Sequence, residues 1–148
     1  RRIWRMYRRV RKEGRAITPQ SPASDLHELR KSCKKLRYLI EFFVSIYPEE
    51  AVKPLVKALK RLLDNLGEFQ DLEVHADHLR EFTGQMQAEG EVPLSTLLSM
   101  GGLVAGLLQR QVAAREVFDK RFKRFDVPEN RAAYRSLFRA QTEALESR

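Results

Sequence analysis

The chain has 148 residues, of which 43% are hydrophobic and 32% are charged, a balance typical of one globular domain and not of a disordered segment. The 28 Lys and Arg residues against 20 Asp and Glu residues give a formal net charge of +8, which points to an anionic partner and leaves the fold open. Cys33 is the single cysteine, which excludes an internal disulfide and a zinc site built from cysteines.

The longest apolar stretch, Leu97 to Leu108, covers about twelve residues and falls short of the roughly 20 that span a bilayer. We therefore expect a buried core helix there and no membrane insertion. The cysteine content and the lack of a signal peptide favour a cytoplasmic location. Because the first residue is Arg1 and not Met, a fragment of a longer protein is one expectation.

Helical periodicity dominates the chain and strand signals are nearly absent, so we predict an all-α fold. The expected helices cover residues 2–17, 25–46, 54–82, 94–125 and 129–146, with a loop over 84–93. Asp25 and Glu28 have the spacing of a capping box at the start of the second helix. Pro54 suits the first turn of the third. Gly102 and Gly106 predict a face of the fourth helix that another helix approaches closely.

Four long helices with short connections predict an up-and-down bundle, followed by a short C-terminal helix. We expect a single helical domain over 1–148, with the bundle at about 1–125 and the tail helix at 126–148. The tail is expected to dock through Tyr134, Leu137, Phe138 and Leu145. The expected buried stripe of the second helix is Leu29, Cys33, Leu36, Ile40 and Phe43.

The first helix concentrates positive charge on one face. At 100° per residue, five basic residues fall within an arc of about 80°; they are Arg1, Arg5, Arg8, Lys12 and Arg15. Arg9 flanks this ridge, and Glu13 is the only acid in the first 17 residues. Like charges four residues apart destabilise a helix, so a bound anion is the natural compensation.

The second helix is basic as well, with His27 in its first turn, where free backbone N–H groups favour anions. One face of this helix carries His27, Lys34, Tyr38 and Glu41, and Arg30, Lys31 and Arg37 lie beside it. Two further basic sets follow, Lys53, Lys57, Lys60 and Arg61, then Lys120, Arg121, Lys123 and Arg124. We expect the cations of the first two helices to converge into one groove that no carboxylate enters; for any one set alone, a solvated helix face is the alternative.

The segment LHELRKSCKKLRYLIEFF (26–43) closely resembles the signature of the CHAD family, the conserved-histidine α-helical domains. That pattern places Arg three, Lys seven and an Arg–Tyr pair ten and eleven residues after a His. Here these residues are His27, Arg30, Lys34, Arg37 and Tyr38. The segment LKRLLDNLGEFQDLEVHADHL (59–79), with its Leu66–Gly67 step, is similar to the next helix of the family.

This resemblance implies a helical bundle that binds inorganic polyphosphate through a basic channel, often in association with polyphosphate granules. It assigns binding to His27, Arg30, Lys34 and Arg37, and extends to Arg5, Arg8, Arg9 and Arg15. Family members typically contain two related bundles, whereas this chain has one signature helix and resembles the C-terminal half. The resemblance therefore implies either a missing N-terminal half or a homodimer.

We predict a non-catalytic polyphosphate-binding module without a cofactor, because the chain has no Gly-rich phosphate loop and no G-x-S-x-G. The alternatives are a nucleic-acid-binding domain and an accessory domain of a phosphoanhydride-hydrolysing enzyme. Asp71, His75 and His78 have a spacing that can hold a metal, but a solvated patch is the preferred interpretation. The full predicted binding set is Arg5, Arg8, Arg9, Lys12, Arg15, His27, Arg30, Lys31, Lys34, Arg37, Tyr38, Lys57, Lys60, Arg61, Arg121 and Arg124.

Overall fold

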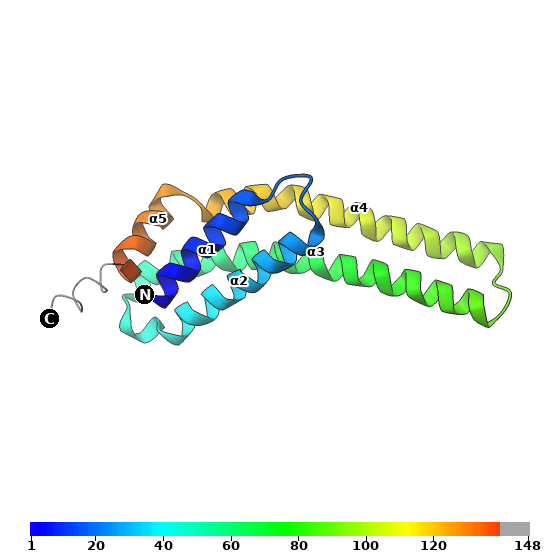
Figure 1. Cartoon of the computed structure of the whole chain (residues 1–148), viewed down its shortest axis with the longest axis horizontal. Helices are drawn as coiled ribbons and strands as arrows, with labels where there is room; N and C mark the ends of the chain where they lie inside the picture. Colours follow the sequence, from blue (N-terminus) through cyan, green and yellow to red (C-terminus); the bar gives the residue numbers. More distant parts are fainter. Residues whose placement is uncertain (140–148) are drawn as a thin grey trace.

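The computed structural model describes residues 1–139, and every regular element within them is helical. The elements are α1 (Arg2–Ala16), α2 (Ala23–Phe42), a 3-10 turn (Val44–Ile46), α3 (Glu49–Glu89), α4 (Leu94–Phe125), α5 (Pro128–Tyr134) and a π-helical turn (Arg135–Arg139). Figure 1 shows α1 and α2 against one end of the α3–α4 hairpin, whose other end projects alone. The predicted all-α fold is confirmed.

One continuous core fills the end of the molecule where the four long helices meet. α1 turns one face inward because its small and apolar residues recur at helical spacing; they are Ile3, Tyr7, Val10 and Gly14. The predicted stripe of α2 is confirmed at Leu29, Cys33, Leu36 and Ile40, all fully buried, and Phe43 is partly buried. Burial raises the pKa of the Cys33 thiol, so this cysteine is a core residue.

Gly14 allows α1 to approach α4 closely. A Cβ atom at this position would lie 2.0 Å from the ring of Phe122, well inside contact distance. Phe122 is itself buried, so the ring has little room to move aside. A glycine is therefore required here for the two helices to pack as they do.

The C-terminal segment docks on α1 through aromatic side chains. Tyr134 and Tyr7 stack with ring centroids 3.8 Å apart, and both are fully buried. Burial raises the pKa of Tyr7 to about 12. Phe138 is buried and Leu137 packs against the core, as predicted, whereas Leu145 lies outside the described residues.

Two predicted helix starts and one predicted loop are wrong. α2 begins at Ala23 after Pro22, without a side-chain cap, so Asp25 and Glu28 form no capping box. α3 begins at Glu49, where two acidic residues favour the positive end of the helix dipole, and it passes through Pro54. It also continues beyond Gly84 to Glu89, because pairing with α4 along its length (Figure 1) outweighs the low helix propensity of glycine.

The predicted buried helix at Leu97–Leu108 is also wrong. Leu98 and Leu103 are 68% and 58% exposed, and the first buried residue of α4 is Ala114. α1 and α2 span only 15 and 20 residues, against 41 for α3, so they do not reach the hairpin's far half. No atom lies within 4 Å of a Cβ added at Gly102 or Gly106, so no helix packs closely on that face of the described structure.

Candidate anion-binding surfaces

The basic residues of α2 line a cleft of about 580 Å³ against α3 and α4. α2 contributes Arg30, Lys34, Arg37 and Tyr38, and α4 contributes Arg110. Arg30 donates to Gln70 Oε1 of α3 at 2.7 Å, and its Nε is buried without a hydrogen-bond partner. A Cβ at Gly67 would lie 3.7 Å from that Nε, an ordinary contact distance, so the guanidinium lies against α3 at this position.

Carboxylates enter the same cleft from α3, contrary to our expectation. Asp64, Glu68 and Asp71 all line it, and Arg37 pairs along its own helix with Glu41 at 2.8 Å. The prediction of an acid-free groove is therefore wrong for this helix. The sequence did not reveal which face of α3 meets α2. At this point α3 turns a polar face toward α2, and that face carries the carboxylates. Any anion bound here shares the cleft with three negative charges.

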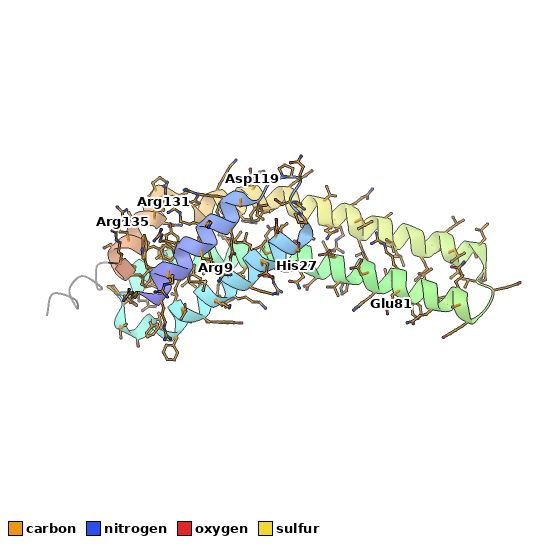
Figure 2. The ribbon with its side chains drawn as sticks, in the orientation of Figure 1. Arg9, His27, Glu81, Asp119, Arg131 and Arg135 are labelled. Carbon is orange, nitrogen blue, oxygen red and sulfur yellow. The ribbon has the colours of Figure 1, made fainter. Side chains whose placement is uncertain are left out.

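His27 and Lys31 lie outside the residues that line this cleft. The Nε2 atom of His27 lies 2.7 Å from Glu73 Oε2, which makes an ion pair when the imidazole is protonated. Lys31 pairs with Glu28 at 2.9 Å, and this contact lowers the pKa of Glu28. Figure 2 shows His27 near the start of α2. Both cations therefore already contact a carboxylate.

The ridge of α1 is exposed but separate from the cleft, to which α1 contributes no lining residue. Arg5, Arg8 and Lys12 make no ion pair within the described part of the chain. Arg9, by contrast, pairs with Glu13 at 2.8 Å (Figure 2 labels Arg9), and Arg15 pairs with Asp126. The basic faces of the two helices thus do not form the single groove that we predicted.

Asp126 organises the inner edge of this ridge. Arg15 and Arg11 contact its two carboxylate oxygens at 2.7 and 3.0 Å. Burial alone would raise the pKa of Asp126, but the hydrogen bonds from both guanidinium groups outweigh it, and the pKa lies below the usual value. Arg15 is therefore committed to a structural contact between α1 and the end of α4.

The third and fourth basic sets of the sequence meet in a groove between α3 and α4. Lys57 and Arg61 lie one turn apart on α3, and Arg121 and Arg124 lie one turn apart on α4. Together they line a groove of about 260 Å³ to which, in the described structure, no carboxylate contributes. We call this the α3–α4 groove.

A second cleft continues from the α3–α4 groove toward α2. It measures about 500 Å³, has an apolar floor, and shares Lys57 and Arg61 with the groove. Lys53 and Lys60 also line it, along with Glu41 and Glu49. The lysines of the third set thus extend the basic surface beyond the groove itself.

The family model for the CHAD domain matches residues 1–80. The chain belongs to the CHAD family. No curated protein sequence matches it. The CHAD match covers α1, α2 and most of α3, including the signature helix and its cleft. Arg121 and Arg124 lie beyond the matched residues, so they belong to the part of the molecule that the family model does not describe.

Arg110 is the residue of the cleft that our sequence reasoning missed. It stands between two glutamines just after the apolar and small-residue segment 97–108 and is the first charged residue after Glu91, which was a usable signal. Asp71, His75 and His78 are all exposed. Asp71 and His75 line the 580 Å³ cleft beside Arg30, Lys34 and Arg37, which we call the CHAD cleft. Within residues 1–139, no three His, Cys, Asp or Glu side chains gather closely enough to hold a metal ion. None of the described helices has the length and apolarity needed to cross a membrane.

Proposed function

We propose that this CHAD chain binds inorganic polyphosphate without catalysing a reaction on it. One observation carries the proposal: four cations from distant parts of the sequence line one groove, and no carboxylate of residues 1–139 lines it with them. Those residues are Lys57, Arg61, Arg121 and Arg124. CHAD domains are associated with polyphosphate binding, and this groove offers cations from two helices that no carboxylate of the described residues accompanies.

The chemistry of these side chains suits a phosphate polymer. A guanidinium group presents a planar fork that donates two hydrogen bonds to one phosphate, while an ammonium group acts as a point charge. Cations one helical turn apart stand about 5 to 6 Å from each other, so a flexible chain with one charge per phosphate can follow them. Binding would be driven largely by release of counterions from the polymer.

The unpaired part of the α1 ridge offers a second binding surface for the same polymer. Arg5, Arg8 and Lys12 are exposed on successive turns and are not held by acidic neighbours among the described residues. We expect the CHAD cleft to bind the polymer more weakly, because a polyanion there meets three carboxylates. A long polymer that contacts more than one of these surfaces binds more tightly than a short one through effective concentration.

Titration with long-chain polyphosphate over a range of salt concentrations tests this function. We expect log affinity to fall with log salt at a slope of roughly −3, taking about −0.7 for each of four neutralised phosphates, the value for single-stranded nucleic acid. Arg61→Gln should weaken binding by about tenfold, in line with the loss of a charge-assisted contact. Phosphate release is measured in parallel.

The matched control is Arg80→Gln, which makes the same charge change on the projecting part of α3, where Arg80 pairs with Asp77. We expect it to leave affinity within about twofold. Equal effects of the two substitutions would contradict the groove as the site. Tighter binding of single- or double-stranded DNA than of polyphosphate at equal phosphate concentration would favour a nucleic-acid partner instead.

A further inference from the structure

A fourth basic pocket lies between α1 and the C-terminal segment, next to the inner edge of the α1 ridge. It measures about 510 Å³ and is lined by Trp4 and Arg11 of α1, Arg131 of α5, and Arg135 of the following turn. Figure 2 labels Arg131 and Arg135, which lie on the same short segment above α1. A pocket of this size holds a small ligand of drug-like dimensions.

The pocket is strongly cationic. Three guanidinium groups line it and, in the described structure, no carboxylate does. The Nε of Arg131 is buried and has no hydrogen-bond partner, a costly state for a charged donor. Arg11 is 20% exposed and is held in place by Asp126 at 3.0 Å. Arg11 is fixed, Arg131 has a buried unpaired donor and Arg135 is exposed. Together these three residues favour a compact polyvalent anion.

Trp4 adds an aromatic surface to this charge. Its ring is partly buried and packs against Tyr7 with centroids 5.6 Å apart, and the indole also lines the pocket. A pocket for inorganic phosphate alone has no use for an indole. Aromatic side chains beside guanidinium groups suit a ligand that carries a ring as well as phosphate, because the ring stacks while the arginines hold the anion.

We propose that this pocket binds a nucleoside diphosphate or triphosphate, with the phosphates on Arg11, Arg131 and Arg135 and the base against Trp4. The site shares no residue with the α3–α4 groove or with the CHAD cleft. It therefore stands independently of polyphosphate binding, and either function can fail while the other holds.

Trp4 is the only tryptophan of the chain, so its fluorescence reports on this pocket alone. We expect ADP to change the emission of the full chain saturably, and pyrophosphate to bind at least fivefold more weakly. Arg131→Gln and Arg135→Gln should each weaken ADP by about tenfold, as expected for loss of a hydrogen bond to a charged group. Circular dichroism and thermal unfolding establish that each variant is folded, and exposed Arg135 is the safer substitution.

Trp4→Leu tests the base contact by calorimetry, since that variant has lost its fluorophore. Loss of stacking should weaken ADP by about tenfold and leave pyrophosphate within about twofold. Arg80→Gln, on the projecting hairpin, is the matched charge control and should not alter ADP binding. The proposal is overturned if ADP does not bind, if pyrophosphate binds as tightly as ADP, or if folded Arg135→Gln and Arg131→Gln variants bind ADP as the parent chain does.

Discussion

The CHAD cleft and the α3–α4 groove both gather arginine and lysine, but they differ in the charges that face those cations. Within residues 1–139, Arg30, Lys34 and Arg37 share their cleft with three carboxylates of α3, whereas the groove residues share theirs with none. In the cleft, Arg30 contacts Gln70 and lies next to Gly67. Arg30 thus helps to join α2 to α3.

This difference teaches that the number of cations on a helix face is a poor guide to its attraction for anions. At an effective dielectric of about 20, two unit charges 4 Å apart interact by about 4 kcal/mol, so a carboxylate beside a guanidinium cancels much of its pull on a third charge. Among the described residues, no carboxylate lines the α3–α4 groove, so its cations keep their attraction for an anion. The family signature marks the helix α2, whereas the groove that no carboxylate of the described structure lines lies between α3 and α4.

Charge reversal in the groove gives the largest expected effect. Arg61→Glu with Arg121→Glu replaces two attractive contacts by two repulsive ones, and we expect polyphosphate affinity to fall by about a hundredfold at low salt. Fluorescence anisotropy of a labelled polymer measures it. A loss below threefold in a variant that unfolds like the parent chain would place the main binding surface elsewhere.

Removing the acids of the CHAD cleft gives the next largest effect. Asp64→Asn with Glu68→Gln should tighten polyphosphate binding by about fivefold, because the cations opposite then face two fewer carboxylates. The matched control, Asp77→Asn with Glu81→Gln, makes the same charge change farther along α3 and should change affinity by less than twofold. Equal tightening by both pairs would mean that net charge alone decides binding.

Removing the cations of the CHAD cleft gives a smaller effect. We expect Arg30→Ala with Arg37→Ala to weaken polyphosphate binding by about threefold, because each lost cation leaves a carboxylate that it had partly neutralised. Competition between parent and variant for one labelled polymer measures the ratio. A loss equal to that of the groove variant would erase the distinction between the two surfaces.

The smallest expected effect concerns stability, at the one carboxylate that holds α1 to the end of α4. Because the folded-state pKa of Asp126 is lowered, its contribution is present at neutral pH and disappears as the pH falls below the usual carboxylate range. Asp126→Asn should lower the melting temperature by about 3 °C at pH 7. The difference should shrink as the pH falls through the lowered pKa of Asp126, and an offset that stays constant from pH 7 into the acidic range would contradict this account.

The fold was predictable from sequence wherever one helix face decides burial. The α2 stripe through Leu29, Leu36 and Ile40 follows helical periodicity and is buried as predicted. Periodicity failed at Leu98 and Leu103, because an apolar stretch reveals its own character and not whether a neighbour covers it. α1 and α2 end before they reach that part of α4, and helix length relative to a partner is a tertiary property.

The candidate surfaces were predictable as separate sets of residues, but their grouping was not. Helix geometry places Lys57 beside Arg61 and Arg121 beside Arg124, and the sequence gives no sign that these pairs meet. Conversely, the α1 and α2 faces were expected to converge and do not. Arg131 and Arg135 were not predicted, because the apolar pattern of this segment marks the residues that dock and not the cations beside them, and only the docking of α5 on α1 brings Trp4 to them.

The projecting part of the α3–α4 hairpin should unfold locally at a lower free energy than the packed end of the molecule. Beyond Ala76 on α3 and before Ala114 on α4, no side chain of the described hairpin is buried, while Phe82 and Leu94 are largely exposed. Backbone amides near the Gly90 turn should therefore exchange their hydrogens through local fraying, and those of Leu36 or Leu59 only through global unfolding. A polyanion bound in the α3–α4 groove should slow hydrogen exchange at Leu36 and Leu59 and leave exchange near Gly90 unchanged.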